Sequence, residues 1–201
     1  DHIFSTSVDP KIPPVDLLAA DFKEKLNDHK SYRAKASEIE NAIKHHIKIK
    51  LEDDPEYYKS LSEKLESIIR KNEEHWEELV QLLMDFRGTI EEEREARAEE
   101  LGLTETEFAF HGILMAEITK GEGVEAIDEE MHLKIKSVVQ QLVSMMDEAT
   151  EIVDFFAPQK GNDRKTVRRN IKRAILEEFD DLDLVKPVTD RFMELAEVKF
   201  Q

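Results

Sequence analysis

The sequence predicts an all-α protein, a bundle-like helical domain of about seven helices. Three observations support this class: apolar residues recur every three or four positions, only six glycines occur, and no segment alternates like a β-strand. Hydrophobic residues make up 40% of the 201 residues, which argues against disorder despite 37% charged residues. We therefore expect one helical domain or two small helical lobes.

The first two helices are predicted before residue 52. Residues 1–14 contain three prolines and no periodicity, so they should form an extended lead-in. Apolar residues at helical spacing predict a first helix over about residues 15–29. A second, amphipathic helix over residues 31–51 carries one apolar stripe at intervals of four, made of Ile39, Ile43 and Ile47.

One long helix is predicted over about residues 55–100. Asp54 can cap its first N–H groups, and Pro55 suits the first helical position. From Tyr58 onwards, apolar residues step by three or four, which is the spacing of a helix that packs along a partner. The charged stretch 91–102 continues this helix as a solvated face and ends in glycine.

Four more helices follow, over about residues 104–120, 128–156, 163–179 and 187–200. Thr104 and Glu107 have the spacing of a capping box, and the glycines at 121 and 123 should end that helix. Asp128, Asp163 and Pro187 are the expected starts of the others. The apolar face of the second should be buried as far as its end, including Ile152, Val153 and Phe156.

Composition excludes several classes of function. The absence of cysteine rules out disulfides, thiolate zinc sites and cysteine nucleophiles, and it fits a reducing, cytoplasmic setting. No apolar run approaches the length of a membrane span, so we expect a soluble protein without membrane contact. The net charge of −17 would repel nucleic acid unless the basic residues are gathered in one place.

Short motifs in the chain do not predict catalysis. The adjacent His45 and His46 point about 100° apart on a helix, so they cannot easily bind one metal ion. Asp-Glu-Ala-Thr at 147–150 and Glu-Val-Lys at 197–199 match helicase and nuclease motifs, but both fall on predicted helices instead of strands. We predict no catalytic residue, no metal site and no cofactor in this chain.

The strongest functional signal is a basic helix with its cations on one half and its apolar residues largely on the other. These cations are Arg164, Lys165, Arg168, Arg169, Lys172 and Arg173. They could pair with acidic residues of the same chain as a solvated face, or they could bind nucleic acid or an acidic partner. Lys44 and Lys48, with Lys50, form a second basic surface on the 31–51 helix.

A long pattern over residues 33–79 resembles the C-terminal helical region of the restriction (motor) subunit of type I restriction-modification enzymes. It reads RAKASEIENAIKHHIKIKLEDDPEYYKSLSEKLESIIRKNEEHWEEL. The resemblance is carried among others by His45, His46, Asp54, Pro55, Tyr57, Tyr58 and Trp76. The segments PPVDLLAADFKEKLN, IVDFF, RRNIKRAI and DLDL resemble its flanks. Residues 15–201 would then be this domain, and residues 88–130, which match less clearly, a variable insertion.

The resemblance implies an ATP-driven DNA translocase and endonuclease that assembles with methyltransferase and specificity subunits. In that family the nuclease site and the ATP- and Mg²⁺-dependent motor lobes precede this region, so we expect this chain to be the C-terminal part of a longer protein. The implied role is to dock the motor subunit onto the methyltransferase core. Two alternatives are the guidance of duplex DNA by the basic helix, and a structural brace for the motor lobes through the apolar stripe of the 55–90 region.

Overall fold

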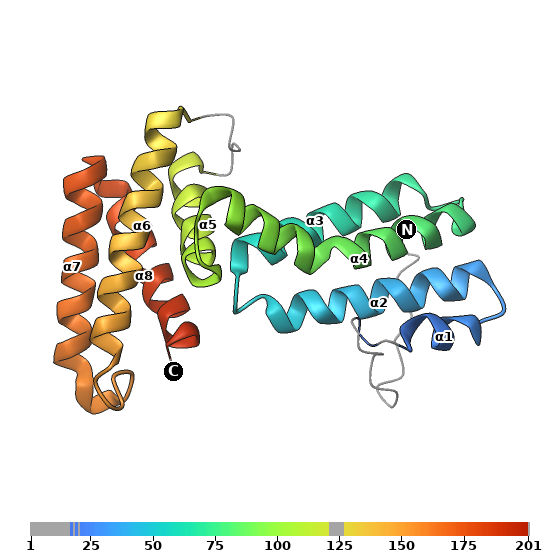
Figure 1. Ribbon diagram of the computed structural model, residues 1–201, viewed down its shortest axis with the longest axis horizontal. Helices are drawn as coiled ribbons and strands as arrows, with labels where there is room; N and C mark the ends of the chain where they lie inside the picture. Colours follow the sequence, from blue (N-terminus) through green and yellow to red (C-terminus); the bar gives the residue numbers. More distant parts are fainter. Residues whose placement is uncertain (1–16, 18, 20, 121–126, 201) are drawn as a thin grey trace. The chain divides into compact units, whose positions relative to one another are not determined.

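A computed structural model describes residues 17, 19, 21–120 and 127–200, which form helices and short links (Figure 1). No strand occurs in these ranges, so the predicted all-α class is confirmed. The described chain has eight α-helices where about seven were expected, and a 3-10 helix, η2 (Pro158–Lys160), precedes α7. The α-helices are α1 (Phe22–Asn27), α2 (Tyr32–Lys50), α3 (Pro55–Lys71), α4 (Trp76–Leu101), α5 (Glu105–Thr119), α6 (Glu129–Thr150), α7 (Gly161–Phe179) and α8 (Leu182–Lys199).

The described residues divide into two compact units. The first unit contains α1, almost all of α2, the later turns of α3 and the earlier turns of α4. The second contains the first turns of α3, the later turns of α4, and α5 to α8. The predicted lead-in over residues 1–14 and the predicted stop at glycines 121 and 123 lie outside the described residues.

The apolar stripe predicted for α2 is buried. Ile39 and Ile43 are 0% exposed and Ile47 is 6% exposed. Phe22 of α1 is also buried, and the Arg87 guanidinium of α4 lies over its ring, 4.5 Å from the ring centroid. The stripe is therefore buried, as its spacing predicted.

The predicted single helix over residues 55–100 is wrong, because α3 and α4 are separate helices joined by a turn over residues 72–75. The side-chain amide of Asn72 donates a hydrogen bond to the carbonyl oxygen of Ile68 (2.8 Å), which helps to close the end of α3. This segment contains no glycine or proline, and the helical spacing continues from Asn72 to Trp76. Periodicity alone therefore gave no sign of the turn.

The helices α5 to α8 form a four-helix core in the second unit (Figure 1). α5 packs against α6 and α8, and α7 packs against the same two helices. Phe110 of α5 and Phe192 of α8 are both 0% exposed and meet edge to face, with 5.0 Å between ring centroids. Gly112 allows a close approach of α5 to α3, because an added Cβ would lie 3.3 Å from the Cβ of Glu56.

Capping residues mark several helix ends as predicted. The capping box of α5 is confirmed: the Thr104 hydroxyl accepts from the Glu107 N–H (3.2 Å), and the Glu107 carboxylate accepts from the Thr104 N–H (2.7 Å). Asp128 caps α6 by accepting from the Met131 N–H (2.8 Å). Gly102, in the left-handed conformation at φ 61°, follows the end of α4.

Three helix boundaries in the second unit differ from the predictions. α6 ends at Thr150, well before the predicted end at Phe156, because a loop intervenes before η2. α7 begins before Asp163, so this carboxylate lies in the first turn instead of at the cap position. There it still interacts favourably with the helix dipole. α8 also begins early: Asp181 caps it, and Pro187 lies inside the helix.

Candidate partner-binding surface

The predicted basic helix is α7, and its two faces differ as expected. Val167, Ile171 and Ile175 are buried in the core of the second unit. All six predicted cations lie on this helix, namely Arg164, Lys165, Arg168, Arg169, Lys172 and Arg173. They differ in what they contact. Their role in binding stays a prediction, but their different contacts show which charges remain available to a partner.

Arg164 and Arg168 bind to groups of their own unit. The Arg164 guanidinium donates hydrogen bonds to the backbone oxygens of Phe155 (3.2 Å) and Ala157 (2.5 Å). Arg168 forms an ion pair with Asp190 of α8. The charge of Arg168 is therefore paired within the unit, whereas Arg164 is held against the loop by neutral backbone oxygens.

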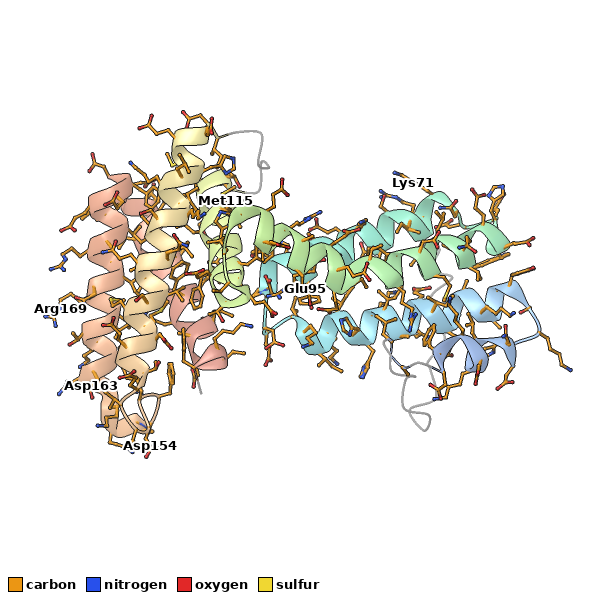
Figure 2. All side chains as sticks on the ribbon, viewed as in Figure 1. Lys71, Glu95, Met115, Asp154, Asp163 and Arg169 are labelled. Atoms are coloured by element: carbon orange, nitrogen blue, oxygen red, sulfur yellow. The ribbon has the colours of Figure 1, made fainter. Side chains whose placement is uncertain are left out.

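Lys165, Arg169 and Lys172 form an outward row on α7, which we name the cation row. Spacings of four and three residues place them in a narrow sector about 10 Å long. All three are exposed, and none forms an ion pair within the described ranges; Arg169 donates only to the Thr166 hydroxyl (3.2 Å). Figure 2 shows Arg169 pointing away from the rest of its unit.

The remaining predicted cations are partly paired. Arg173 lies 3.7 Å from Glu177, and both side chains are exposed (71% and 66%), so this ion pair is weak. In the first unit, Lys44 of α2 binds Glu40 at 2.6 Å. Lys48 is exposed and has no ion pair with any residue that the structure describes. The α2 lysines thus form a separate and smaller basic surface.

The adjacent histidines of the family-like pattern lie in the last turns of α2. His45 is exposed and His46 is half-buried. Within the described chain, no group of three or more His, Cys, Asp or Glu side chains is placed to hold a metal ion. Trp76 begins α4, and the Arg33 guanidinium lies over its ring at 5.4 Å from the centroid.

Asp54 caps α3 and Pro55 takes the first helical position, as predicted. One Asp54 carboxylate oxygen accepts from the Tyr57 N–H (3.3 Å), and the other accepts from Arg94 Nε (3.0 Å). Arg94 also binds the Glu105 carboxylate at 3.1 Å. Asp54 is 1% and Arg94 6% exposed, so a buried ion pair ties the start of α3 to α4 and α5.

Sequence reasoning missed this buried ion pair. Burial raises the pKa of the Asp54 carboxyl, although Arg94 and a backbone N–H act in the opposite direction. Burial lowers the pKa of Arg94, but Asp54 and Glu105 more than offset that effect and raise it. A signal was present, because Arg94 and Ala98 follow Ile90 at intervals of four and so fall on the apolar stripe.

The two tyrosines in the family-like pattern are buried hydrogen-bond donors. Tyr57 is 5% and Tyr58 2% exposed. The Tyr57 hydroxyl donates to the backbone oxygen of Ile90, and the Tyr58 hydroxyl donates to the Glu91 carboxylate (3.0 Å). Burial raises the pKa of Tyr57 to about 12, and burial together with Glu91 raises the pKa of Tyr58. Both therefore stay protonated at neutral pH and join α3 to α4.

A buried histidine that the sequence did not single out lies on α5. His111 is 7% exposed, and burial, with a smaller contribution from His132, lowers its pKa to about 4. It lines a hollow of about 410 Å³ together with Tyr57, Phe108 and Met115. His111 is consequently neutral at pH 7, and the stability of the second unit should depend on acid pH.

The chain matches, over residues 3–201, the family described as "Type I restriction enzyme HindI endonuclease subunit-like, C-terminal". The chain belongs to this family. A candidate type I restriction enzyme MjaIXP endonuclease subunit from Methanocaldococcus jannaschii is 26% identical over 158 residues. That match covers 75% of the chain and 14% of the relative, so the chain spans a small part of the relative's length. No solved structure matches the chain.

The predicted resemblance to the C-terminal region of a type I restriction subunit is thereby confirmed. Both the family and the relative are described as endonuclease subunits of type I restriction enzymes. None of the helices in the described part of this type I C-terminal domain is both long and apolar enough to cross a membrane.

Proposed function

We propose that this type I C-terminal domain docks an ATP-dependent endonuclease and DNA-translocase subunit onto the methyltransferase and specificity subunits of its complex. The domain itself carries out no reaction in this proposal. The ATP and Mg²⁺ implied by the family resemblance would bind elsewhere in the parent protein. The observation that carries the proposal is the cation row, because its three exposed charges remain unpaired within the described chain.

The cation row gathers three charges, unpaired within the described residues, on one face of one helix. The chain has 46 acidic and 29 basic residues, so acidic partners are abundant within it. Arg94, Arg168 and Arg191 each form ion pairs with them. A row that points outward instead can steer and orient an acidic surface of another subunit, because complementary charges raise association rates and fix the register of docking.

A second candidate, duplex DNA as the partner, is supported by the same row. Three phosphate contacts would give a slope of about −3 in the logarithm of affinity against the logarithm of salt concentration. The net charge of −17 opposes such binding over the rest of the surface. Protein docking therefore fits the charge distribution better.

The structural-brace alternative depends on an exposed apolar stripe along α3 and α4. The described stripe is instead buried: Leu65 and Leu83 are 0% exposed in the first unit, and Ile90 is 1% exposed in the second. These side chains already pack within the domain. They offer no apolar surface for bracing a motor lobe, which supports docking through α7 over this alternative.

A charge-reversal experiment separates these candidates. The row variant carries Lys165→Glu, Arg169→Glu and Lys172→Glu. A control variant carries the same charge change at three exposed lysines without ion pairs in the described chain, namely Lys23→Glu, Lys30→Glu and Lys59→Glu. Binding to the purified methyltransferase–specificity complex is measured by calorimetry without DNA, and binding to duplex DNA alone is measured across salt.

Docking through the cation row predicts affinity at least about tenfold weaker for the row variant and little change for the control. Equal affinity of the row variant and the unmodified chain for the complex would contradict the proposal. If docking is unchanged while binding to DNA alone is lost in the row variant, the DNA alternative replaces it.

A further inference from the structure

Residues 151–157, between α6 and η2, place apolar side chains at the surface where the sequence predicted a buried helical face. Val153 is 80% and Ile152 39% exposed, and Phe156 is only half-buried. The loop lies at one end of the α6–α7 pair, where Asp154 is labelled in Figure 2. Single exposed apolar residues are ordinary, but neighbouring ones on one loop suggest a contact surface.

The loop has a defined conformation that presents these side chains. Asp154 takes the left-handed conformation (φ 59°), which aspartate tolerates better than most residues. The Phe155 N–H donates to the Ile152 oxygen (3.1 Å), and the Ala157 N–H donates to the Asp154 oxygen (2.9 Å). Arg164 binds the backbone oxygens of Phe155 and Ala157. Successive turns and one arginine thus hold the apolar surface in place.

A hollow of about 490 Å³ lies between this loop and the end of α8. A second hollow of about 270 Å³ shares Phe156 and Glu197 with the first and extends along α7 and α8. We call the two together the loop groove. Its first part is of a size that takes several partner side chains, and its apolar walls are formed by Ile152, Val153, Phe155, Phe156, Ala157 and Phe200.

Negative charges predominate around the loop groove. Four exposed carboxylates line it, and none forms an ion pair within the described ranges: Glu151, Asp154, Glu194 and Glu197. Of the two arginines that line it, Arg168 is paired with Asp190. Arg164 is held by neutral backbone oxygens and keeps its positive charge, but the four carboxylates outnumber it. An occupant of the loop groove therefore meets an apolar wall with an acidic rim.

We propose that the loop groove binds a segment of a partner protein in which apolar side chains are flanked by lysine or arginine. The apolar side chains would cover Val153 and Ile152, and the cations would complement the carboxylates of the rim. Nucleic acid and anionic lipid surfaces are repelled by the same carboxylates. This inference goes beyond docking through the cation row, which would take a surface of the opposite charge, so either can hold without the other.

The probe is a short synthetic peptide with leucines flanked by lysines, labelled with fluorescein. Its binding to the full chain is followed by fluorescence anisotropy. One control peptide has glutamate in place of each lysine, and another has serine in place of each leucine. Raising salt from about 0.1 to about 1 M shortens the Debye length from about 10 Å to about 3 Å, so binding should weaken with salt.

Two groove variants are compared with a matched control. Ile152→Ser with Val153→Ser removes apolar surface at exposed positions, and Glu194→Lys with Glu197→Lys reverses rim charge. The control, Glu73→Lys with Glu74→Lys, makes the same charge change at exposed residues of the first unit. We expect affinity about tenfold weaker in each groove variant and nearly unchanged in the control.

Weak or absent binding of both control peptides completes the expected result. The proposal is overturned if the leucine–lysine peptide does not bind, if the glutamate peptide binds as well, or if the groove variants bind like the unmodified chain. Because this experiment uses no methyltransferase complex, its failure is distinct from a failure of the docking proposal.

Discussion

Replacing Arg94 by methionine should destabilise the second unit by roughly 3–5 kcal/mol, because it leaves the Asp54 carboxylate buried without its charge partner. A loss of stability of this size is expected because Asp54 is 1% exposed and its carboxylate lies 3.0 Å from the Arg94 guanidinium. Methionine keeps an unbranched apolar chain at this position, so loss of packing should contribute little. The cost should shrink as the pH falls, because the unpaired Asp54 can then take up a proton.

A double-mutant cycle isolates the charge interaction. Asp54→Asn keeps a good capping residue for the Tyr57 N–H but removes the charge. Arg94 still contacts Glu105, whose side chain is 71% exposed, so this single change should cost less, about 1–3 kcal/mol. The double variant should cost about 1–3 kcal/mol less than the sum of the two, because neither charge is then left buried alone.

Urea unfolding provides the measurement, with far-UV circular dichroism reporting all helices. The only tryptophan, Trp76, belongs to the first unit, so its fluorescence reports that unit separately. Arg97→Met is the matched control: this arginine is exposed on the next turn of α4, and its loss should change stability by less than about 0.5 kcal/mol. Additive costs in the cycle, or a loss below about 1 kcal/mol for Arg94→Met, would refute the reasoning.

Two further predictions concern α5. The unfolded chain protonates His111 near pH 6.5 and the folded chain near pH 4, so stability should fall by about 3 kcal/mol as the pH drops through this window. His111→Gln should flatten that slope in urea titrations at several pH values, whereas the exposed His75→Gln should keep it. Thr104→Ala should cost about 1 kcal/mol by loss of the capping box, measured by thermal unfolding. Thr106→Ala on the same turn should cost less, and an equal loss would contradict the capping argument.

Local signals predicted the helices whose ends and faces depend on neighbouring residues. The Ile39 stripe, the Thr104 capping box and the Asp128 cap all lie where the sequence indicated. The turn after Asn72 escaped prediction because the chain reverses there without glycine or proline, while the apolar spacing continues. Likewise, Val153 continues the apolar pattern of α6 but lies beyond its end.

The sequence predicted the basic helix but not which of its cations remain free. Arg168 pairs with Asp190, 22 positions further along the chain, and no local spacing reveals such a contact. Arg164 is engaged by backbone oxygens of a loop that was expected to be helix. Only the packed structure leaves Lys165, Arg169 and Lys172 as an outward row. The loop groove arose where the pattern failed, a frequent property of functional surfaces.

The most direct test of the central claim is competition between this chain and the full endonuclease subunit for the methyltransferase–specificity complex. Docking through α7 predicts that the unmodified chain displaces the full subunit, and that the variant with Lys165, Arg169 and Lys172 changed to glutamate does so only at concentrations at least about tenfold higher. Failure of the unmodified chain to displace the subunit, or equal displacement by the variant, would contradict the account.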